Sequence, residues 1–266
     1  MQESIISYLP NNHPWRSSIF WFDTVDSTNT RAKELAAAGA PHGTVLIADR
    51  QTGGRGRLGR SFQSPAGMGI YLSLILRPNC PAAQLMHLTC AVAVSTCDAV
   101  EQTLNFRPSI KWINDLVAQR RKLAGILTEL SVNPRTGFVD YAVVGIGINC
   151  QQCEDDFPAE LRSIAGSAAM VTGKPVDRTR LAAAMIQELE RMSRKLLTEK
   201  VQTMERYRGE CVTIGAEVDV IRNDLHRRGT ALDIDNEGGL LVSFTDGSTE
   251  TVQSGEVSVR GLFGYV

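Results

Sequence analysis

Residues 53–60 read Gly-Gly-Arg-Gly-Arg-Leu-Gly-Arg, the most informative stretch of the chain. Gly54, Gly56 and Gly59 have the spacing Gly-x-Gly-x-x-Gly of a dinucleotide-binding turn. That motif requires a helix to open at the turn, whereas residues 61–67, Ser-Phe-Gln-Ser-Pro-Ala-Gly, predict a continued loop. No Gly-Lys-Ser or Gly-Lys-Thr ends the run, so a P-loop is excluded as well.

Three arginines lie within six residues of this loop, at positions 55, 57 and 60. Guanidinium groups bind phosphate and carboxylate oxygens in bidentate geometry, and glycines let the backbone approach a ligand closely. The loop therefore predicts an anion-binding site. Taken alone, it leaves open a flexible solvated loop or a nucleic-acid contact.

Two further segments suggest the edge of a site. Lys111-Trp-Ile-Asn-Asp115 ends a predicted strand and is followed by Arg121-Lys-Leu-Ala-Gly-Ile-Leu127, while Gly145-Ile-Gly-Ile-Asn149 ends another strand with an amide side chain. The glycines of the last segment allow another group to lie against the strand. The simpler alternatives are a charged hairpin turn with Trp112 in the core, and a tightly packed central strand.

Hydrophobic patterning predicts a mixed set of helices and strands before residue 209. We expect strands at 19–25, 44–49, 69–76, 109–113, 123–131 and 138–149, and helices at about 28–38, 82–104 and 178–207. Asp26-Ser-Thr-Asn29 offers N-caps for the first helix, and Gly39 and Pro41 end it. Residues 51–69 are rich in glycine and predict a loop.

The pattern changes after Gly209, where short alternating segments are separated by turns at 223–224, 236–239 and 246–247. Such spacing is typical of a small antiparallel barrel. We therefore expect two domains, at residues 1–209 and 210–266.

Composition excludes several classes of protein. The 266 residues carry 28 Lys plus Arg and 29 Asp plus Glu, a formal charge of −1, which argues against a general nucleic-acid binder. The hydrophobic share of 43% is sufficient for a core and excludes global disorder.

The N-terminus lacks the pattern of a signal peptide, and the apolar stretches fall short of the ~20 residues of a membrane span. We expect a cytoplasmic protein that does not bind membranes. Its six cysteines are then reduced thiols, and the lone pair Cys150 and Cys153 lacks the partners of a metal site.

Together these motifs resemble the bacterial biotin protein ligases, biotin–[acetyl-CoA carboxylase] ligases. The resemblance runs from about residue 20 to 149, on Asp26-Ser-Thr-Asn29, Gln51 with the loop 54–60, and the three segments at 111–115, 121–127 and 145–149. Gly239-Leu-Leu-Val242 and Ser254-Gly-Glu-Val-Ser258 look like the family's small C-terminal domain. The resemblance implies an α+β fold: a mixed-sheet, class II synthetase-like biotin/lipoate ligase domain with a small C-terminal SH3-like β-barrel. One departure is Ile113, where many relatives have proline.

The implied reaction has two steps and uses ATP, Mg²⁺ and biotin as substrate. Biotin carboxylate attacks the α-phosphate of ATP, giving biotinyl-5'-AMP and pyrophosphate, and a lysine amine of a biotin carboxyl carrier protein then displaces AMP. By resemblance the catalytic residues are Lys122 and Arg57. The biotin-binding residues are Ser27, Thr28, Asn29, Gln51, Gly54, Arg55, Gly56, Arg57 and Lys122. The nucleotide-binding residues are Arg55, Arg57, Phe62, Asn114, Lys122 and Asn149. No metal site of the protein's own is expected, although Asp115 is a candidate to help hold Mg²⁺ with ATP.

Two other functions remain open: a lipoate or octanoate transferase, which shares the broader fold, and a nucleic-acid binder that uses the arginine loop. The pairing of the loop with Lys-Trp-x-Asn-Asp favours biotin.

Some relatives are also repressors with an N-terminal DNA-binding domain, for which ~50 residues are needed. Only 18 residues precede the first expected strand, so we expect no specific DNA binding. Some relatives dimerise by joining their sheets edge to edge, so the resemblance also implies a possible homodimer.

Overall fold

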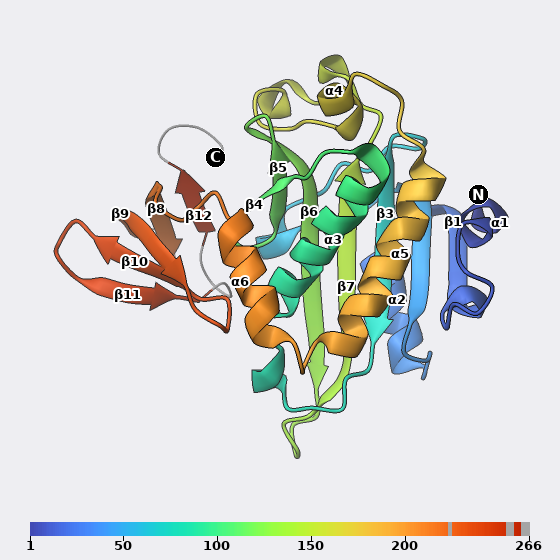
Figure 1. The fold of residues 1–266 in the computed structure, drawn as a ribbon, viewed down its shortest axis with the longest axis horizontal. Coiled ribbons are helices and arrows are strands. Elements are labelled where there is room, and N and C mark those ends of the chain that lie inside the picture. The colour runs from blue at the N-terminus through green and yellow to red at the C-terminus, as the bar shows by residue number, and fades with distance from the viewer. Residues whose placement is uncertain (223–224, 254–257, 262–266) are drawn as a thin grey trace.

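The computed structural model describes residues 1–222, 225–253 and 258–261, the last four by their backbone alone. Residues 19–149 build a seven-stranded sheet in the order β1-β2-β3-β7-β6-β5-β4 (Figure 1). β1 and β2 are parallel, and every other neighbouring pair is antiparallel. The strands are β1 (Ile19–Val25), β2 (Thr44–Gln51), β3 (Gly69–Leu76), β4 (Ser109–Lys111), β5 (Asp115–Ala118), β6 (Arg121–Val132) and β7 (Val139–Asn149). The predicted mixed sheet is confirmed.

Helices cover both faces of this sheet. The helices are α1 (Gln2–Ser7), α2 (Thr28–Ala37), α3 (Leu88–Leu104), α4 (Ala168–Thr172), α5 (Arg178–Lys195) and α6 (Lys200–Glu210). Short 3₁₀ turns lie at Arg16–Ser18, Arg57–Gly59, Ala82–Leu85, Glu154–Asp156 and Ala159–Leu161. α3 and α5 cross one face and share its main core (Figure 1). α2 packs Ala32 and Ala36 against Leu46, Ile75 and Val143 on the other face. Because both faces are covered, all eight residues of β3 are buried.

Three predicted elements differ from the structure. The helix expected at 82–104 is a 3₁₀ turn followed by α3, which begins only at Leu88. The helix expected at 178–207 is two helices, because the chain turns at Leu196. The carbonyl oxygen of Leu196 lies 2.9 Å from His87 Nε2, which holds this turn against the start of α3. The strand expected at 109–113 ends at Lys111, and the short β5, which was not predicted, pairs with it across a turn.

A second, antiparallel sheet of five strands follows residue 210. Its order is β11-β10-β9-β8-β12, from β8 (Glu217–Arg222), β9 (Leu225–Ile234), β10 (Leu240–Phe244), β11 (Thr249–Val252) and β12 (Ser258–Gly261). This confirms the predicted small β unit and the turns at 236–239 and 246–247. The turn at 223–224 and residues 254–257 lie outside the described residues.

Among the described residues, Ala82–Leu104 has the length and hydropathy of a membrane span. Yet 72% of its most apolar window is buried inside the molecule. The sheet and α5 cover this segment, which is part of the hydrophobic core.

Candidate active site

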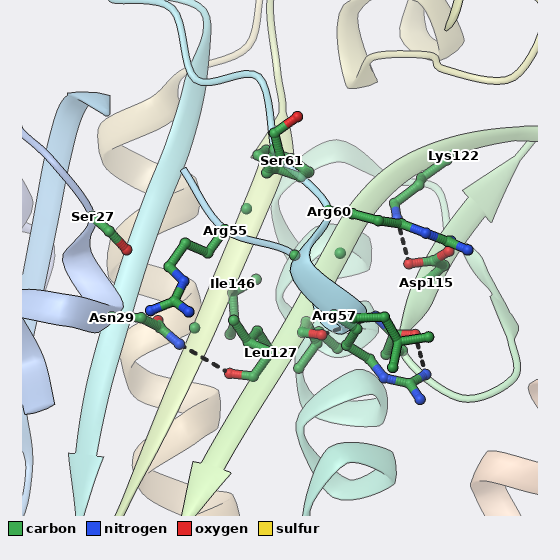
Figure 2. Close-up of a pocket in the computed structure, with 18 of the residues that line it drawn as sticks. Ser27, Asn29, Arg55, Arg57, Arg60, Ser61, Asp115, Lys122, Leu127 and Ile146 are labelled. Atoms are coloured by element: carbon green, nitrogen blue, oxygen red, sulfur yellow. Dashed lines mark hydrogen bonds and ion pairs between the residues drawn. The ribbon is translucent and has the colours of Figure 1, made fainter. Parts of the chain in front are cut away.

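One cavity of about 530 Å³ brings the sequence motifs together (Figure 2). Its walls come from the start of α2, the end of β2, the loop 55–62, the turn between β4 and β5, and the middle of β6 and β7. The lining residues are Ser27, Thr28, Asn29, Gln51, Arg55, Gly56, Arg57, Leu58, Arg60, Ser61, Phe62, Lys111, Trp112, Asn114, Asp115, Lys122, Gly125, Ile126, Leu127, Gly145, Ile146, Gly147 and Ile164.

Hydroxyl and amide groups at the start of α2 form one end of the cavity. Ser27 is the N-cap of this helix, so its side chain and that of Thr28 lie at the helix end that faces the cavity. Thr28 donates to Gln51 Oε1 from its backbone N, at 2.8 Å, and from Oγ1, at 3.0 Å. Gln51 Nε2 donates to Ser64 Oγ at 2.9 Å and keeps a second N–H. This end therefore offers both donors and acceptors to a polar ligand.

Asn29 is held between α2 and the sheet. Its Oδ1 accepts from Ser73 Oγ at 2.6 Å, and its Nδ2 donates to Glu129 Oε2 at 3.0 Å. A Cβ on Gly145 would lie 2.0 Å from Asn29 Oδ1. The glycine at 145 is therefore required for Asn29 to lie against β7.

The arginine loop folds back on itself over the cavity. Gly56 N donates to the Arg60 carbonyl at 2.7 Å, and Phe62 N donates to that of Gly54 at 2.9 Å. A Cβ on Gly54 would meet the Phe62 carbonyl oxygen at 2.4 Å, so this glycine permits the close return of the chain. Phe62 then lies against β7, where a Cβ on Gly147 would lie 2.6 Å from its ring.

Arg57 reaches from the loop to the opposite wall. Its Nη1 donates to Asn114 Oδ1 at 3.2 Å. Burial lowers the pKa of Arg57, while the charge of Asp115 raises it; a guanidinium stays charged under these conditions. The loop therefore places a fixed positive charge inside the cavity.

Lys122 supplies a second cation, and its position is fixed at the backbone. Its N donates to the Ile164 carbonyl at 2.7 Å, and its carbonyl accepts from Gly166 N at 2.9 Å. Its Nζ lies 2.6 Å from Asp115 Oδ1 (Figure 2). The ion pair aims the lysine into the cavity above β5.

The turn that carries Asn114 is supported from α6 and from the C-terminal unit. Trp112 Nε1 donates to the Gly238 carbonyl at 2.9 Å, and Trp112 N donates to Thr213 Oγ1 at 2.9 Å. Tyr207, fully buried, donates to the Ile113 carbonyl at 3.0 Å. Asn114 Nδ2 donates in turn to the Ile126 carbonyl at 2.9 Å. The turn that carries Asn114 is thus held between the large and the small sheet.

All the predicted site residues line the cavity except Gly54 and Asn149. Gly54 does not line the cavity, but its carbonyl accepts the hydrogen bond from Phe62 N that closes the loop. Asn149 is buried; its Nδ2 donates to the Gly166 carbonyl at 3.0 Å, and its Oδ1 accepts from Gln152 Nε2 at 3.2 Å.

The sequence reasoning missed several residues of the site. Ser73 is a polar residue within the buried strand β3, a signal that could have identified it. Ile164 lies far along the chain in an irregular segment and carries no such signal. Within the described residues, no group of three or more His, Cys, Asp or Glu side chains could hold a metal ion. The six cysteines are free thiols, with Cys150 buried and Cys153 exposed.

Comparisons with known proteins agree with this geometry. Residues 21–149 match the biotin/lipoate A/B protein ligase family, and residues 213–260 match the biotin protein ligase C terminal domain. The bifunctional ligase/repressor BirA of Bacillus spizizenii is 34% identical over 249 residues, which cover 93% of this chain and 76% of that protein.

The chain belongs to the biotin protein ligase family.

Other members agree across most of their length. A biotin–[acetyl-CoA-carboxylase] ligase of Mycobacterium tuberculosis is 32% identical over 87% of this chain and 85% of its own. The biotin protein ligase of Aquifex aeolicus, solved in complex with biotin and ATP, has 31% identity and a TM-score of 0.77, covering 92% of this chain and 99% of that one.

Proposed function

We propose that this biotin protein ligase joins biotin to ATP in the cavity and then transfers the biotinyl group to a lysine of a biotin carboxyl carrier protein. The observation that carries the proposal is the convergence of two fixed cations, Arg57 and Lys122, with an amide- and hydroxyl-lined pocket in one cavity. A carboxylate and a triphosphate are both anions, and such cations offset their repulsion.

The end of the cavity at α2 suits the ureido ring of biotin. That ring presents two N–H donors and one carbonyl acceptor. Ser27 and the second N–H of Gln51 supply donors, and Thr28 and Asn29 supply acceptor oxygens. Arg55 and Gly56 line the cavity from the arginine loop and close this end.

The junction of biotin with the nucleotide falls between the loop and β6. One biotin carboxylate oxygen attacks the α-phosphorus, and the bond to the bridging oxygen of pyrophosphate breaks. Arg57 and Lys122 stabilise the charge that grows on the phosphate oxygens. In the second step the acceptor amine attacks the acyl carbon, loses a proton and releases AMP with the bonding electron pair.

The nucleotide lies on the side of Asn114 and Phe62, with Asn149 supporting this side from outside the cavity lining. Mg²⁺ bound with ATP would supply positive charge that offsets the charge of its phosphates. Asp115 is the only carboxylate among the described residues that line the cavity, and it would supply one oxygen ligand. Asp115 is already paired with Lys122, so it suits a single supporting contact.

The remaining expectations concern the whole protein. We place the boundary between a catalytic domain (1–209) and an SH3-like domain (210–266), and we propose a cytoplasmic enzyme that binds neither membranes nor a specific DNA operator. β1 is one of the two edge strands of the large sheet, which supports a homodimer formed by joining sheets. An operator-binding assay at physiological salt and sedimentation of the pure protein test the last two points.

The broader family matched by residues 21–149 covers both biotin and lipoate ligases, so substrate choice is the test of the proposal. Purified protein is supplied with ATP, Mg²⁺ and either biotin or lipoate, and pyrophosphate release is measured. We expect release with biotin. Release with lipoate and not with biotin would overturn the assignment.

A further inference from the structure

Glu129 lies below the biotin end of the cavity, on β6, without lining it. Lys33 Nζ donates to its Oε1 at 2.7 Å, and Asn29 Nδ2 donates to its Oε2 at 3.0 Å. Burial raises the pKa of Glu129, but the hydrogen bonds from Lys33 and Asn29 and the charges of Lys33 and Arg55 outweigh it and lower the pKa below its usual value. Glu129 is therefore an ionised carboxylate at neutral pH.

An ionised carboxylate can only accept hydrogen bonds, and this fixes the orientation of the Asn29 amide. The Asn29 NH₂ group faces two acceptors, Glu129 and the Leu127 carbonyl, the latter at 3.4 Å (Figure 2). Its oxygen faces Ser73, which donates to it. If the amide were reversed, its oxygen would point at a carboxylate. What Asn29 can offer a ligand is thus an oxygen lone pair, which accepts an N–H.

Glu129 also acts on the loop. Arg55 and Asn29 line the same cavity, and the positive charge of Arg55 contributes to the lowered pKa of Glu129. Arg55 is exposed and lies on a glycine-rich loop. The half-buried carboxylate therefore attracts this arginine toward the biotin end.

We propose that Glu129 is a positioning residue for biotin: it orients the Asn29 amide as an acceptor and supplies the countercharge that holds Arg55 over the pocket. The inference rests on the proposed function and adds a specificity element to it. Because Glu129 acts at one end of the cavity, its loss affects biotin and not ATP.

The test compares Glu129→Gln with Glu34→Gln, a control that removes an exposed carboxylate on the neighbouring helix α2, paired with Arg31 at 2.8 Å. A glutamine keeps the shape but presents an N–H as readily as an oxygen. We expect Glu129→Gln to raise the KM for biotin on the order of tenfold, since a hydrogen bond to a charged group is lost. The KM for ATP should stay within about twofold, and Glu34→Gln should match the wild type in both.

A double-mutant cycle with Asn29→Ala separates positioning from a general loss of structure. If Glu129 acts through Asn29, Glu129→Gln costs less in the Asn29→Ala background than in the wild type. An unchanged KM for biotin in Glu129→Gln, equal rises in both KM values, or strictly additive effects would refute the inference. A wild-type protein that does not use biotin would instead refute the proposed function.

Discussion

Both the backbone and the side-chain amine of Lys122 are held in place by neighbouring groups. Two backbone hydrogen bonds to the segment 164–166 fix its main chain, and the ion pair with Asp115 fixes its amine. A Cβ on Gly125 would lie 3.3 Å from Lys122 Nζ, so the strand leaves room for the side chain to lie flat above it. The amine is therefore preorganised before substrates arrive.

Replacement of Lys122 by alanine should abolish most adenylate formation. Removing one preorganised charge at a reacting phosphate costs ~10²–10³-fold in rate. The side chain is 30% exposed, so the fold should be preserved. Biotin-dependent pyrophosphate release measures the rate, and circular dichroism checks the fold. A folded Lys122→Ala protein with the wild-type rate would remove Lys122 from the mechanism.

Sequence reasoning at the residue scale works where chemistry and spacing coincide. The arginine loop could be predicted because its residue types suit anions, and Lys122 because its segment resembles a motif of the biotin protein ligases. The reason for Gly145 and Gly147 could not be, since it depends on Asn29 and Phe62 packing against them from distant segments. The role proposed for Glu129 depends on the same kind of long-range packing, since Asn29 and Lys33 reach it from α2.

At the scale of elements, the turn 235–239 of the small sheet links the two parts of the molecule. Gly238 has a φ of +87° and accepts the Trp112 indole N–H through its carbonyl. Lys200 of α6 forms an ion pair with Glu237 of the same turn. This turn therefore supports the wall that carries Asn114.

Two glycines of the small sheet test this support. Gly238→Ala and Gly247→Ala each force an L residue to a φ near +85°, at a similar cost of about 1–2 kcal/mol in stability. The Cβ at 238 would meet Cys90 Sγ at 3.0 Å, whereas that at 247 has no described atom within 4 Å. We expect only Gly238→Ala to raise the KM for ATP, by roughly fivefold or more. Equal KM values for ATP in the two variants would contradict a role for this contact.

Element prediction was limited where tertiary packing overrides local pattern. The apolar stripe of α5 continues to Leu196 and suggests an unbroken helix, yet the chain turns there to bring α6 and Tyr207 under the Ile113 turn. β5 is four residues long and gains its identity only by pairing with β4 and β6. By contrast, β1 and β3 have the predicted bounds because each is a strongly apolar run between clear turn signals.

At the scale of the whole molecule, histidines with lowered pKa values make stability depend on pH. Burial lowers the pKa of His87, and it also lowers the pKa of His13 and His42. Between these lowered values and the unfolded value of 6.5, the unfolded chain binds more protons than the folded one. Stability should therefore fall as the pH drops below about 6.5.

His87→Gln isolates one contribution, since glutamine keeps a donor for the Leu196 carbonyl but does not titrate. Urea unfolding at pH 7.5 and 5.5 measures the change in stability. We expect a smaller loss on acidification in His87→Gln than in the wild type. An identical pH dependence of stability in both proteins would show that burial does not lower the pKa of His87.

The chain as a whole has a formal charge of −1, yet positively charged side chains gather around the cavity. In the proposed reaction this is where the two anionic substrates meet. A turn of the small sheet supports the wall that carries Asn114, and the start of α2 forms the opposite end of the cavity.

The most direct measurement uses a biotin carboxyl carrier domain as acceptor. The enzyme, ATP, Mg²⁺ and biotin are mixed with the domain, and intact mass and peptide mapping follow the modification. We predict one biotinyl group on one lysine, strictly dependent on ATP, with one pyrophosphate released per transfer. A carrier domain that stays unmodified with biotin, or that is modified without ATP, would contradict the account.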